Sequence, residues 1–326
     1  MILVTGGAGF IGSNLVGALA ERGCEVVVCD WLRSDERWRN IAKHEIADLV
    51  APERLSEWLA QAPKLDAVFH MGANSSTTET DVDNIAELNV RATLRLLEWC
   101  TKTRTRLIYA SSAATYGDGS TGFSDDASPE ALAVLRPLNA YGWSKHFIDR
   151  RIARQTVRGD AMPPQCAGLK FFNVYGPNEY HKGSMKSVVA QNCAHVMAGG
   201  AINLFKSGRP DYGDGGQLRD FIYVRDCVNV MLWLLDNPQV SGLFNLGTGK
   251  ARTWLDLANA LFAATGRKPS IEFVPMPETL AAKYQYFTEA KMDKLRAAGY
   301  EAPFTPLEDG VADYVKRFLA TSDPYR

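Results

Sequence analysis

The chain begins with MILVTGGAGFIG, residues 1–12, and this stretch decides the fold. Its apolar start predicts a buried strand, which stops at the evenly spaced glycines Gly6, Gly9 and Gly12. The apolar periodicity of residues 10–19 predicts a helix directly after the turn. Such a turn lets a pyrophosphate approach the main chain, and the helix N-terminus offers it free N–H groups. The stretch therefore predicts a dinucleotide site, and Asp30, at the predicted end of the next strand, completes the pattern.

Composition limits the classes of protein to which the chain can belong. Its 326 residues are enough for a large core in one domain or two, and 46% are hydrophobic while 22% are charged. The net charge of −1 gives no support for a nucleic-acid partner. No apolar run approaches a membrane-spanning length and the N-terminus has no signal-peptide pattern, so we expect a cytoplasmic protein without a membrane partner. The cysteines lack a C-x-x-C pair and the histidines lack ligand spacing, which predicts no metal site.

Strand and helix patterns alternate through the first half of the chain. After the first strand, the predicted strands are Glu25–Cys29, Glu45–Ala47, Ala67–His70, Arg106–Ala110 and Gly168–Phe172. The predicted helices between them are Pro52–Gln61, Val82–Cys100 and Ala140–Val157. Repeated strand–helix units predict an α/β fold with a doubly wound, Rossmann-type parallel sheet, whose ligands lie at the carboxyl ends of the strands. Asp30, Asp48, Ser111 and Ser112 stand at such predicted ends.

The second half of the chain changes character. Glycine, proline and aromatic residues crowd residues 173–216, which predicts a loop. The later elements are predicted at Asp226–Leu235, Gly242–Leu246, Trp254–Thr265, Met292–Ala298 and Leu307–Leu319. We expect a dinucleotide-binding domain at 1–172, with 219–248 packing back on it. A smaller C-terminal substrate-binding domain then comprises 173–218 and 249–326.

Tyr141 and Lys145 form a Tyr-x-x-x-Lys pair on a predicted helix. Positions i and i+4 share a helix face, and a nearby ammonium lowers the pKa of a phenol. The phenol can then remove or return a proton at an alcohol carbon while a nicotinamide exchanges the hydride. The pair follows a strand that ends in Ser111 and Ser112, whose hydroxyls can hold the same substrate oxygen.

These motifs resemble those of the extended short-chain dehydrogenase/reductases that act on nucleotide sugars. The resemblance rests on the glycine turn, the serine pair, the Tyr-x-x-x-Lys pair and Asn173–Pro177. Four further segments narrow it, over essentially the whole chain, to the ADP-glycero-manno-heptose 6-epimerases of that family: His70–Glu79, Ala110–Gly117, His181–Met185 and Asn245–Gly249. The resemblance implies an isomerase of carbohydrate metabolism that inverts C6 of the heptose through a ketone. Its product would serve lipopolysaccharide core assembly, and a homo-oligomer is implied, with a pentamer suggested.

The resemblance also implies which residues bind the nicotinamide cofactor. The glycines lie with Phe10 and Ile11 on its pyrophosphate, Asp30 and Trp31 lie at the adenosine ribose, and Asp48 lies near the adenine. The nicotinamide side is lined by Met71, Gly72, Ala73, Asn74, Ser75, Asn89 and Val174.

Catalytic and substrate-binding residues follow from the same resemblance. Ser112 and Tyr141 are implied to hold the reacting oxygen, Lys145 to support Tyr141 and the nicotinamide ribose, and Lys182 to act as a second acid/base beside the cofactor. The residues implied to grip the ADP-heptose are Ser75, Ser112, Asn173, Ser184, Gln191, Phe205, Lys206, Ser207, Gly208, Arg219 and Tyr284. An arginine can clamp a diphosphate through two parallel hydrogen bonds, which suits Arg219. Its neighbour Asp220 is expected to fix the loop rather than to react.

The dinucleotide has two candidate forms. Asp30 favours a free ribose 2′-OH, hence NAD. Arg33, Arg37 and Arg39 favour a 2′-phosphate, and Arg37 aligns with a phosphate-binding lysine of the family. We therefore expect NADP, with NAD as the alternative. Pro52 occupies a second position that is basic in the family.

Two departures from the family concern substrate specificity: Gln191 replaces a histidine, and Asp211–Gln217 is an insertion beside Arg219. One alternative function is another nucleotide-sugar enzyme, such as a UDP-hexose 4-epimerase. A 4,6-dehydratase would carry an acidic pair where this chain has Ala113-Ala114-Thr115. Another alternative is a non-catalytic cofactor-sensing protein, but a sensor has no need to keep the serine, the tyrosine and the lysine of the acid/base site.

Overall fold

A seven-stranded sheet forms the centre of the computed structural model, which describes residues 1–278 and 284–326. The strand order is β10-β6-β5-β4-β1-β2-β3, and every neighbouring pair is parallel. The strands are β1 (Ile2–Thr5), β2 (Val26–Cys29), β3 (Asp48–Val50), β4 (Ala67–His70), β5 (Arg106–Ser112), β6 (Cys166–Phe171) and β10 (Gly242–Leu246). The strand order reverses beside β1, so the crevice for a ligand opens at the carboxyl ends of β1 and β4.

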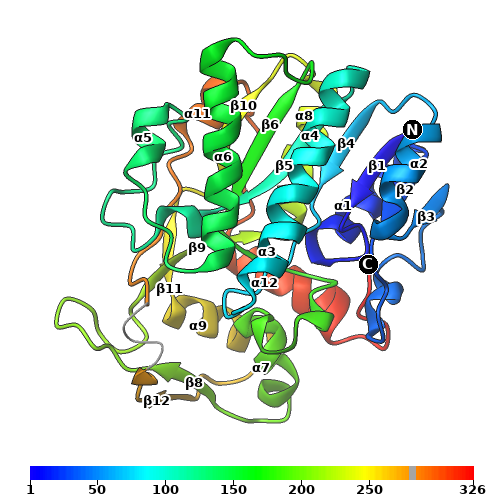
Figure 1. Ribbon diagram of the computed structural model, residues 1–326. Coiled ribbons are helices and arrows are strands. Elements are labelled where there is room, and N and C mark those ends of the chain that lie inside the picture. The colour runs from blue at the N-terminus through cyan, green and yellow to red at the C-terminus, as the bar shows by residue number, and fades with distance from the viewer. Residues whose placement is uncertain (279–283) are drawn as a thin grey trace.

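Helices cover both faces of this sheet: in Figure 1, α4 and α6 cross in front of the strands and α8 lies behind them. The helical segments of this part are α1 (Phe10–Glu21), η1 (Glu36–Asn40), η2 (Pro52–Arg54), α2 (Leu55–Gln61), α3 (Val82–Ile85), η3 (Ala86–Arg91), α4 (Ala92–Thr103), η4 (Ala113–Tyr116), α5 (Pro129–Ala133), α6 (Ala140–Arg158) and α8 (Val224–Asp236). α1 packs along α8. Within the described ranges, no helix combines the length and apolarity needed to cross a bilayer.

A smaller layer adjoins the carboxyl ends of the strands and fills the lower part of Figure 1. It holds two further sheets, with strand orders β11-β9-β7 and β12-β8. These strands are β7 (Asn173–Tyr175), β8 (Ile202–Phe205), β9 (Leu218–Tyr223), β11 (Ala251–Thr253) and β12 (Ile271–Val274). The remaining helical segments are η5 (Tyr180–Met185), α7 (Val188–Met197), α9 (Trp254–Thr265), α11 (Asp293–Ala297), α12 (Leu307–Tyr314) and η6 (Val315–Leu319). α9 packs against both α7 and α12.

The sheet confirms the doubly wound α/β class predicted from the sequence. β1, β2, β4 and β6 are buried at every position, as expected for parallel strands covered on both faces. Ala67–His70, Gly242–Leu246 and Trp254–Thr265 have the predicted bounds. The division of the chain into a dinucleotide-binding and a substrate-binding domain stays a prediction.

Two predictions of local structure are wrong. The third strand is Asp48–Val50 rather than Glu45–Ala47. It lies at the edge of the sheet, where only Val50 is buried, so its apolar signal was too weak to fix its position. The second error is the loop predicted for 173–216, which contains β7, η5, α7 and β8. The glycine and proline signals there belong to the short connections between these elements.

Phe10 joins the two parts of the molecule. It is the first residue of α1, yet its side chain belongs to the core of the smaller layer, with Val189, Phe221 and Leu257. Its neighbour Ile11 packs against both cores. The N-terminus of α1 is therefore held where the large sheet meets the smaller layer.

Asp220 ties the end of the large sheet to the smaller layer, and it fixes the local backbone as the sequence predicted. This buried carboxylate on β9 accepts hydrogen bonds from the Thr248 amide at 2.7 Å, the Thr248 hydroxyl at 2.7 Å, the Gly249 amide at 2.9 Å and the Ala290 amide at 3.0 Å. The turn after β10 and the segment before α11 thus both bind one side chain.

We expect Asp220→Asn to lower the free energy of unfolding by about 2–3 kcal/mol, because the new amide group faces N–H donors that then lose their acceptor. The measurement is equilibrium urea denaturation. Asp236→Asn is the matched control, since Asp236 pairs with Arg22 at the surface, and its loss should cost less than about 1 kcal/mol. Equal small losses in both variants would contradict the anchoring role.

Candidate functional site

The glycine turn between β1 and α1 makes a cradle of bare backbone. Gly6 has φ +66°, a left-handed conformation that favours glycine, and its amide donates to the Cys29 carbonyl at 2.8 Å. A Cβ on Gly12 would overlap the Gly6 carbonyl oxygen, and a Cβ on Gly6 would lie 2.6 Å from the Gly72 Cα. Gly9 caps α1 without any side-chain hydrogen bond. The first N–H groups of α1 therefore face an open cradle, which fits a pyrophosphate.

Asp30 stands at the carboxyl end of β2, beside this cradle. Its Oδ2 accepts from the Ala8 amide at 2.9 Å and its Oδ1 from the Trp31 amide at 2.8 Å. Burial raises the pKa of this carboxyl, while these amides and the charge of Arg37 oppose the rise. The Trp31 indole donates to Glu53 at 2.5 Å, and the Arg33 guanidinium lies 5.5 Å from the centre of the Trp31 ring. Trp31 and Arg33 thus form one wall next to Asp30.

Arg37 lies close to Asp30 but is already paired. Its guanidinium donates to Asp35 twice, at 2.8 Å from Nε and 2.7 Å from Nη2. Arg39 pairs with Glu36 and stacks 5.8 Å from the Tyr325 ring centre. A 2′-phosphate would therefore compete with Asp35 for the Arg37 guanidinium.

Asp48 does not stand at the carboxyl end of its strand, which corrects the sequence-based placement. It is the first residue of β3 and pairs with Val27, two residues before the end of β2. Its carboxylate accepts from the Trp58 indole at 2.8 Å. The residues that do follow β3 at the ligand edge are Ala51 and Pro52.

The segment from Met71 to Ser75 follows β4 and is fixed from both sides. The Gly72 amide donates to the Thr5 hydroxyl at 3.2 Å. The Asn89 side chain accepts from the Asn74 amide at 2.8 Å and donates to the Asn74 carbonyl at 2.9 Å. Asn89 also donates to the Ser144 hydroxyl on α6 at 3.0 Å. Beside α6, the helix that carries Tyr141 and Lys145, the structure thus brings together Met71, Gly72, Ala73, Asn74, Ser75 and Asn89.

Tyr141, Lys145 and Ser112 meet where α6 passes the end of β5. The Lys145 Nζ lies 6.0 Å from the centre of the Tyr141 ring. Burial raises the pKa of the Tyr141 phenol, and a hydrogen bond with Ser112 opposes the rise. Burial lowers the pKa of the Lys145 ammonium to about 8, while Asp149 acts against this shift. A half-buried phenol beside a buried ammonium can exchange a proton with an alcohol or ketone held by Ser112.

Ser111 does not share this role, although the sequence suggested that both serine hydroxyls hold one substrate oxygen. Side chains alternate along a strand, so neighbouring residues face opposite sides. The Ser111 hydroxyl is 1% exposed and donates to Asp149 at 2.7 Å. Ser112 alone remains at the site.

Lys182 lies on η5, above the start of α1. Its Nζ is 5.1 Å from the centre of the Phe10 ring. Burial lowers the pKa of the Lys182 ammonium, and Glu179 opposes this shift. Glu179 is itself buried and accepts from the Ser187 amide and the Ser187 hydroxyl, both at 2.6 Å. The structure therefore brings Lys182 to the glycine turn at the cofactor cradle.

The other residues assigned to the substrate lie in the smaller layer. Asn173 and Val174 lie on β7. The side-chain oxygen of Asn173 accepts a hydrogen bond from the Thr288 hydroxyl at 3.5 Å. Gln191 donates to the Ser184 carbonyl at 3.1 Å and the Lys186 carbonyl at 2.5 Å, so it holds that loop. Phe205 ends β8, and Lys206, Ser207 and Gly208 follow it, with the Gly208 amide donating to the Tyr286 hydroxyl at 3.1 Å.

Arg219 is the distinctive cation of this layer. It is 7% exposed, and its guanidinium lies 4.9 Å from the Tyr284 ring centre and 5.8 Å from the Trp254 ring centre. It donates a hydrogen bond to the neighbouring Leu218 carbonyl at 2.8 Å, and no carboxylate among the described residues pairs with it. Burial lowers the pKa of the guanidinium. A buried cation held between aromatic rings suits an anionic ligand.

Trp254 and Tyr286 were not singled out from the sequence. The sequence predicts Trp254 only as the start of a helix. Tyr286 follows Tyr284 by two residues, a spacing that places both rings on one side of an extended segment. Sequence analysis also missed Ser144 and Glu179, whose partners lie on other elements. Only the spacing of the two tyrosines offered a usable signal.

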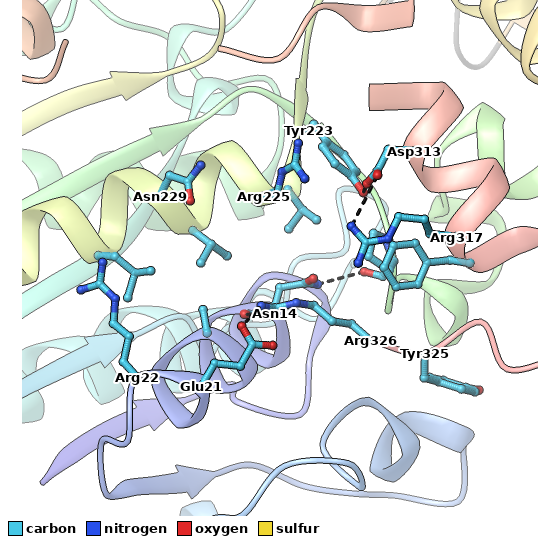
Figure 2. A pocket seen from close by; sticks show the side chains of 16 residues that line it. Asn14, Glu21, Arg22, Tyr223, Arg225, Asn229, Asp313, Arg317, Tyr325 and Arg326 are labelled. Carbon is cyan, nitrogen blue, oxygen red and sulfur yellow. Dashed lines mark hydrogen bonds and ion pairs between the residues drawn. The ribbon is translucent and has the colours of Figure 1, made fainter. Parts of the chain in front are cut away.

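A cavity of about 640 Å³ lies elsewhere, between α1, α8 and η6 (Figure 2). None of the predicted site residues lines it. Its charged groups largely pair with one another, as Arg326 does with Glu21 and Arg317 with Asp313. Among residues 1–278 and 284–326, no cluster of histidines, cysteines and carboxylates has the arrangement of a metal site.

Comparisons with known proteins agree with the fold. The model of the "NAD dependent epimerase/dehydratase family" matches residues 2–247. A protein of Nitratidesulfovibrio vulgaris (strain DP4) named ADP-L-glycero-D-manno-heptose-6-epimerase is 53% identical over 329 residues, which cover 100% of each chain. The crystal structure of the Helicobacter pylori protein of the same name has a TM-score of 0.80 at 28% identity, covering 97% of this chain and 95% of that one. The Thermus thermophilus UDP-glucose 4-epimerase in complex with NAD has a TM-score of 0.73 at 26% identity, covering 95% of this chain and 96% of that one.

We expect Arg219→Met to weaken the binding of ADP by about tenfold or more, because a buried charge-assisted contact to the diphosphate is lost. Isothermal titration with ADP measures it. Arg252→Met is the matched control: Arg252 faces Arg219 across the β9–β11 pair, but Asp256 and Glu308 already neutralise it. A similar loss of ADP affinity in both variants, or no loss in Arg219→Met, would contradict the contact between Arg219 and the diphosphate.

Proposed function

The chain belongs to the NAD dependent epimerase/dehydratase family, and we propose that it inverts C6 of the heptose in ADP-D-glycero-D-manno-heptose, giving ADP-L-glycero-D-manno-heptose. The observation that carries the substrate is the 53% identity, over the full length of both chains, to a protein named for this reaction. Arg219, held between the Trp254 and Tyr284 rings, and the acid/base group of Ser112, Tyr141 and Lys145 support the same conclusion from the geometry.

A nicotinamide dinucleotide fits the residues at the strand ends. The bare backbone of the glycine turn would receive the pyrophosphate, and Asp30 would face the adenosine ribose. Met71–Ser75, Asn89 and Val174 would line the nicotinamide, with Lys145 at its ribose. The chemistry that the bound nicotinamide supplies is hydride acceptance and hydride return.

The acid/base residues carry the protons of the reaction. In the proposed first half, Tyr141 takes the proton of the C6 hydroxyl while Ser112 holds that oxygen, and the heptose becomes a 6-ketone. The Lys145 ammonium favours the Tyr141 phenolate. Inversion requires the ketone to present its other face to the returning hydride. We propose Lys182 as the acid/base for the second face, because it lies half-buried beside the cofactor cradle and the pKa of its ammonium is lowered.

The substrate-binding residues extend from this centre into the smaller layer. We propose that Arg219 and Tyr284 hold the diphosphate and that the remaining contacts come from Ser75, Asn173, Ser184, Gln191 and the segment Phe205–Gly208. Gln191 and the loop at 211–217 are the positions where this grip departs from the family pattern. A UDP-hexose 4-epimerase is the second candidate, supported by the structural similarity to the Thermus thermophilus enzyme at lower identity.

We propose NADP as the natural form of the cofactor. Arg37 lies near enough to Asp30 to influence the pKa of that carboxyl, and Arg33 lines the same wall. The 2′-phosphate would draw the Arg37 guanidinium away from Asp35. A cyclic homo-oligomer, such as a pentamer, and a cytoplasmic location complete the proposal on the strength of the family resemblance.

We expect Arg37→Met to weaken NADP binding by about tenfold or more while leaving NAD binding unchanged, since only NADP carries the phosphate. Fluorescence titration of the cofactor-free protein with each dinucleotide measures both affinities. Arg39→Met is the control, because Arg39 pairs with Glu36 and stacks on Tyr325. A wild-type protein that prefers NAD would overturn the phosphate assignment.

We expect Tyr141→Phe and Lys182→Met each to lower kcat by at least about a hundredfold, because each removes a proton-transfer group. Circular dichroism checks that both variants fold. Product made by the wild-type protein in D₂O should carry no deuterium at C6, because the same hydride leaves and returns. Deuterium at C6 would reject hydride recycling in favour of exchange through an enol. Full activity in Lys182→Met would reject only the acid/base role of Lys182 and leave that of Tyr141 in place.

A further inference from the structure

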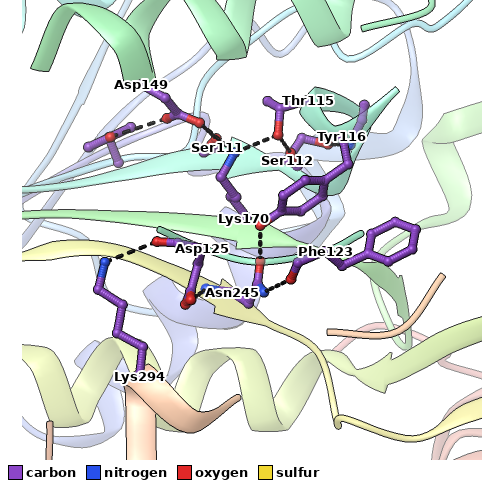
Figure 3. Close-up of polar contacts among 12 residues, drawn as sticks. Ser111, Ser112, Thr115, Tyr116, Phe123, Asp125, Asp149, Lys170, Asn245 and Lys294 are labelled. Atoms are coloured by element: carbon purple, nitrogen blue, oxygen red, sulfur yellow. Dashed lines mark hydrogen bonds and ion pairs between the residues drawn. The ribbon is translucent and has the colours of Figure 1, made fainter. Parts of the chain in front are cut away.

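A buried ion pair lies directly behind the acid/base site. Asp149 on α6 and Lys170 on β6 both have fully buried side chains, and the Lys170 Nζ is 2.9 Å from the Asp149 Oδ2 (Figure 3). Burying two charges removes them from water, and apolar residues of similar volume usually give equal or greater stability. The pair therefore calls for a reason other than stability, and the mechanism above does not use it.

The pair fixes the end of β5 from two directions. Asp149 accepts from the Ser111 hydroxyl at 2.7 Å and the Tyr109 hydroxyl at 3.2 Å, so α6 is held against β5. Lys170 donates to the Thr115 hydroxyl at 2.5 Å, and Thr115 donates to the Ser112 carbonyl at 2.8 Å. Figure 3 shows these contacts converging on Ser111 and Ser112. The backbone of Ser112 is thus held through both members of the pair.

The same carboxylate lies on the catalytic face of α6. Tyr141, Lys145 and Asp149 are spaced four residues apart, so all three side chains share one side of the helix. The titratable or charged groups around Lys145 are Tyr141 and Asp149 on α6 and His70 on β4. His70 contacts the Thr5 hydroxyl at 2.6 Å and the Thr93 hydroxyl at 2.8 Å, and burial lowers its pKa to about 3, so it stays neutral. Asp149 then supplies the negative charge near Lys145.

Resting on the proposed function, we infer that Asp149 and Lys170 are positioning residues of the acid/base site. Lys170 holds Ser112 in place through Thr115, and Asp149 keeps Lys145 protonated while it locks α6 onto β5. Lys145 needs its proton to favour the Tyr141 phenolate. Loss of the Asp149 charge should therefore move the loss of activity at high pH to a lower pH.

The direction of the expected pH shift follows from two opposing effects on the pKa of Lys145. Burial lowers the pKa of its ammonium to about 8, and the Asp149 carboxylate raises it. Without that carboxylate only the lowering effect remains, so Lys145 loses its proton at a lower pH. Lys170 acts differently, because its removal leaves the Asp149 charge in place and breaks only the link to Thr115.

The test compares Asp149→Asn, Lys170→Met and the double variant by NMR titration of protein labelled with ¹³C at the lysine ε-carbon. Lys145→Met assigns the Lys145 signal. We expect the Lys145 midpoint to fall by about one pH unit or more in Asp149→Asn and in the double variant, but not in Lys170→Met. The double variant removes both members of the 149–170 pair, so Lys170 is not left buried without its partner, and the test stays open if Asp149→Asn fails to fold.

The kinetic readout separates the two roles. With ADP-D-glycero-D-manno-heptose, the high-pH limb of kcat should shift with the Lys145 midpoint in Asp149→Asn. Lys170→Met should lower kcat by on the order of tenfold at all pH values, with little change in KM. An unchanged Lys145 midpoint in both variants that lack the carboxylate would overturn the inference and leave a structural ion pair. Because the titration needs no sugar, an inactive wild-type protein would reject the proposed substrate without deciding the role of Asp149.

Discussion

The site depends on one close approach of backbone to backbone, between Gly6 after β1 and Gly72 after β4. A Cβ on Gly6 would lie 2.6 Å from the Gly72 Cα, so the two strand-end turns can touch only because residue 6 is glycine. This contact brings the N-terminus of α1 beside the segment Met71–Ser75. The pyrophosphate cradle and the predicted nicotinamide wall thereby become one surface, and Asn89 extends it to α6.

Three cations of the proposed site share an electrostatic feature. Lys145, Lys182 and Arg219 are all cations whose pKa is lowered by burial. A fold that selected only for stability would pair such groups or expose them. Here the Asp149 carboxylate opposes the shift at Lys145, the Glu179 carboxylate opposes it at Lys182, and Arg219 has aromatic rings as neighbours. Cations of this kind suit a substrate that carries a diphosphate and a reaction that moves protons.

The sequence was sufficient for the features that depend on neighbours along the chain. The glycine turn, most strands of the large sheet and the Tyr141–Lys145 pair all have local patterns, and the structure has each where the pattern predicts it. The sequence could not predict features that depend on a particular side-chain partner. Nothing local shows that Asp35 binds Arg37 or that Ser111 faces Asp149. The edge strand β3 was misplaced for a similar reason, since its position is set by pairing with β2 rather than by its own apolar residues.

The central claim is that the chain recognises an ADP-linked heptose and inverts it at C6. Its most direct test is to incubate the purified protein, in parallel, with ADP-D-glycero-D-manno-heptose and with UDP-glucose, and to separate the epimers by chromatography. We predict that the heptose compound becomes a mixture of its two C6 epimers while UDP-glucose is unchanged. Conversion of UDP-glucose to its C4 epimer, with the heptose compound unchanged, would contradict this claim.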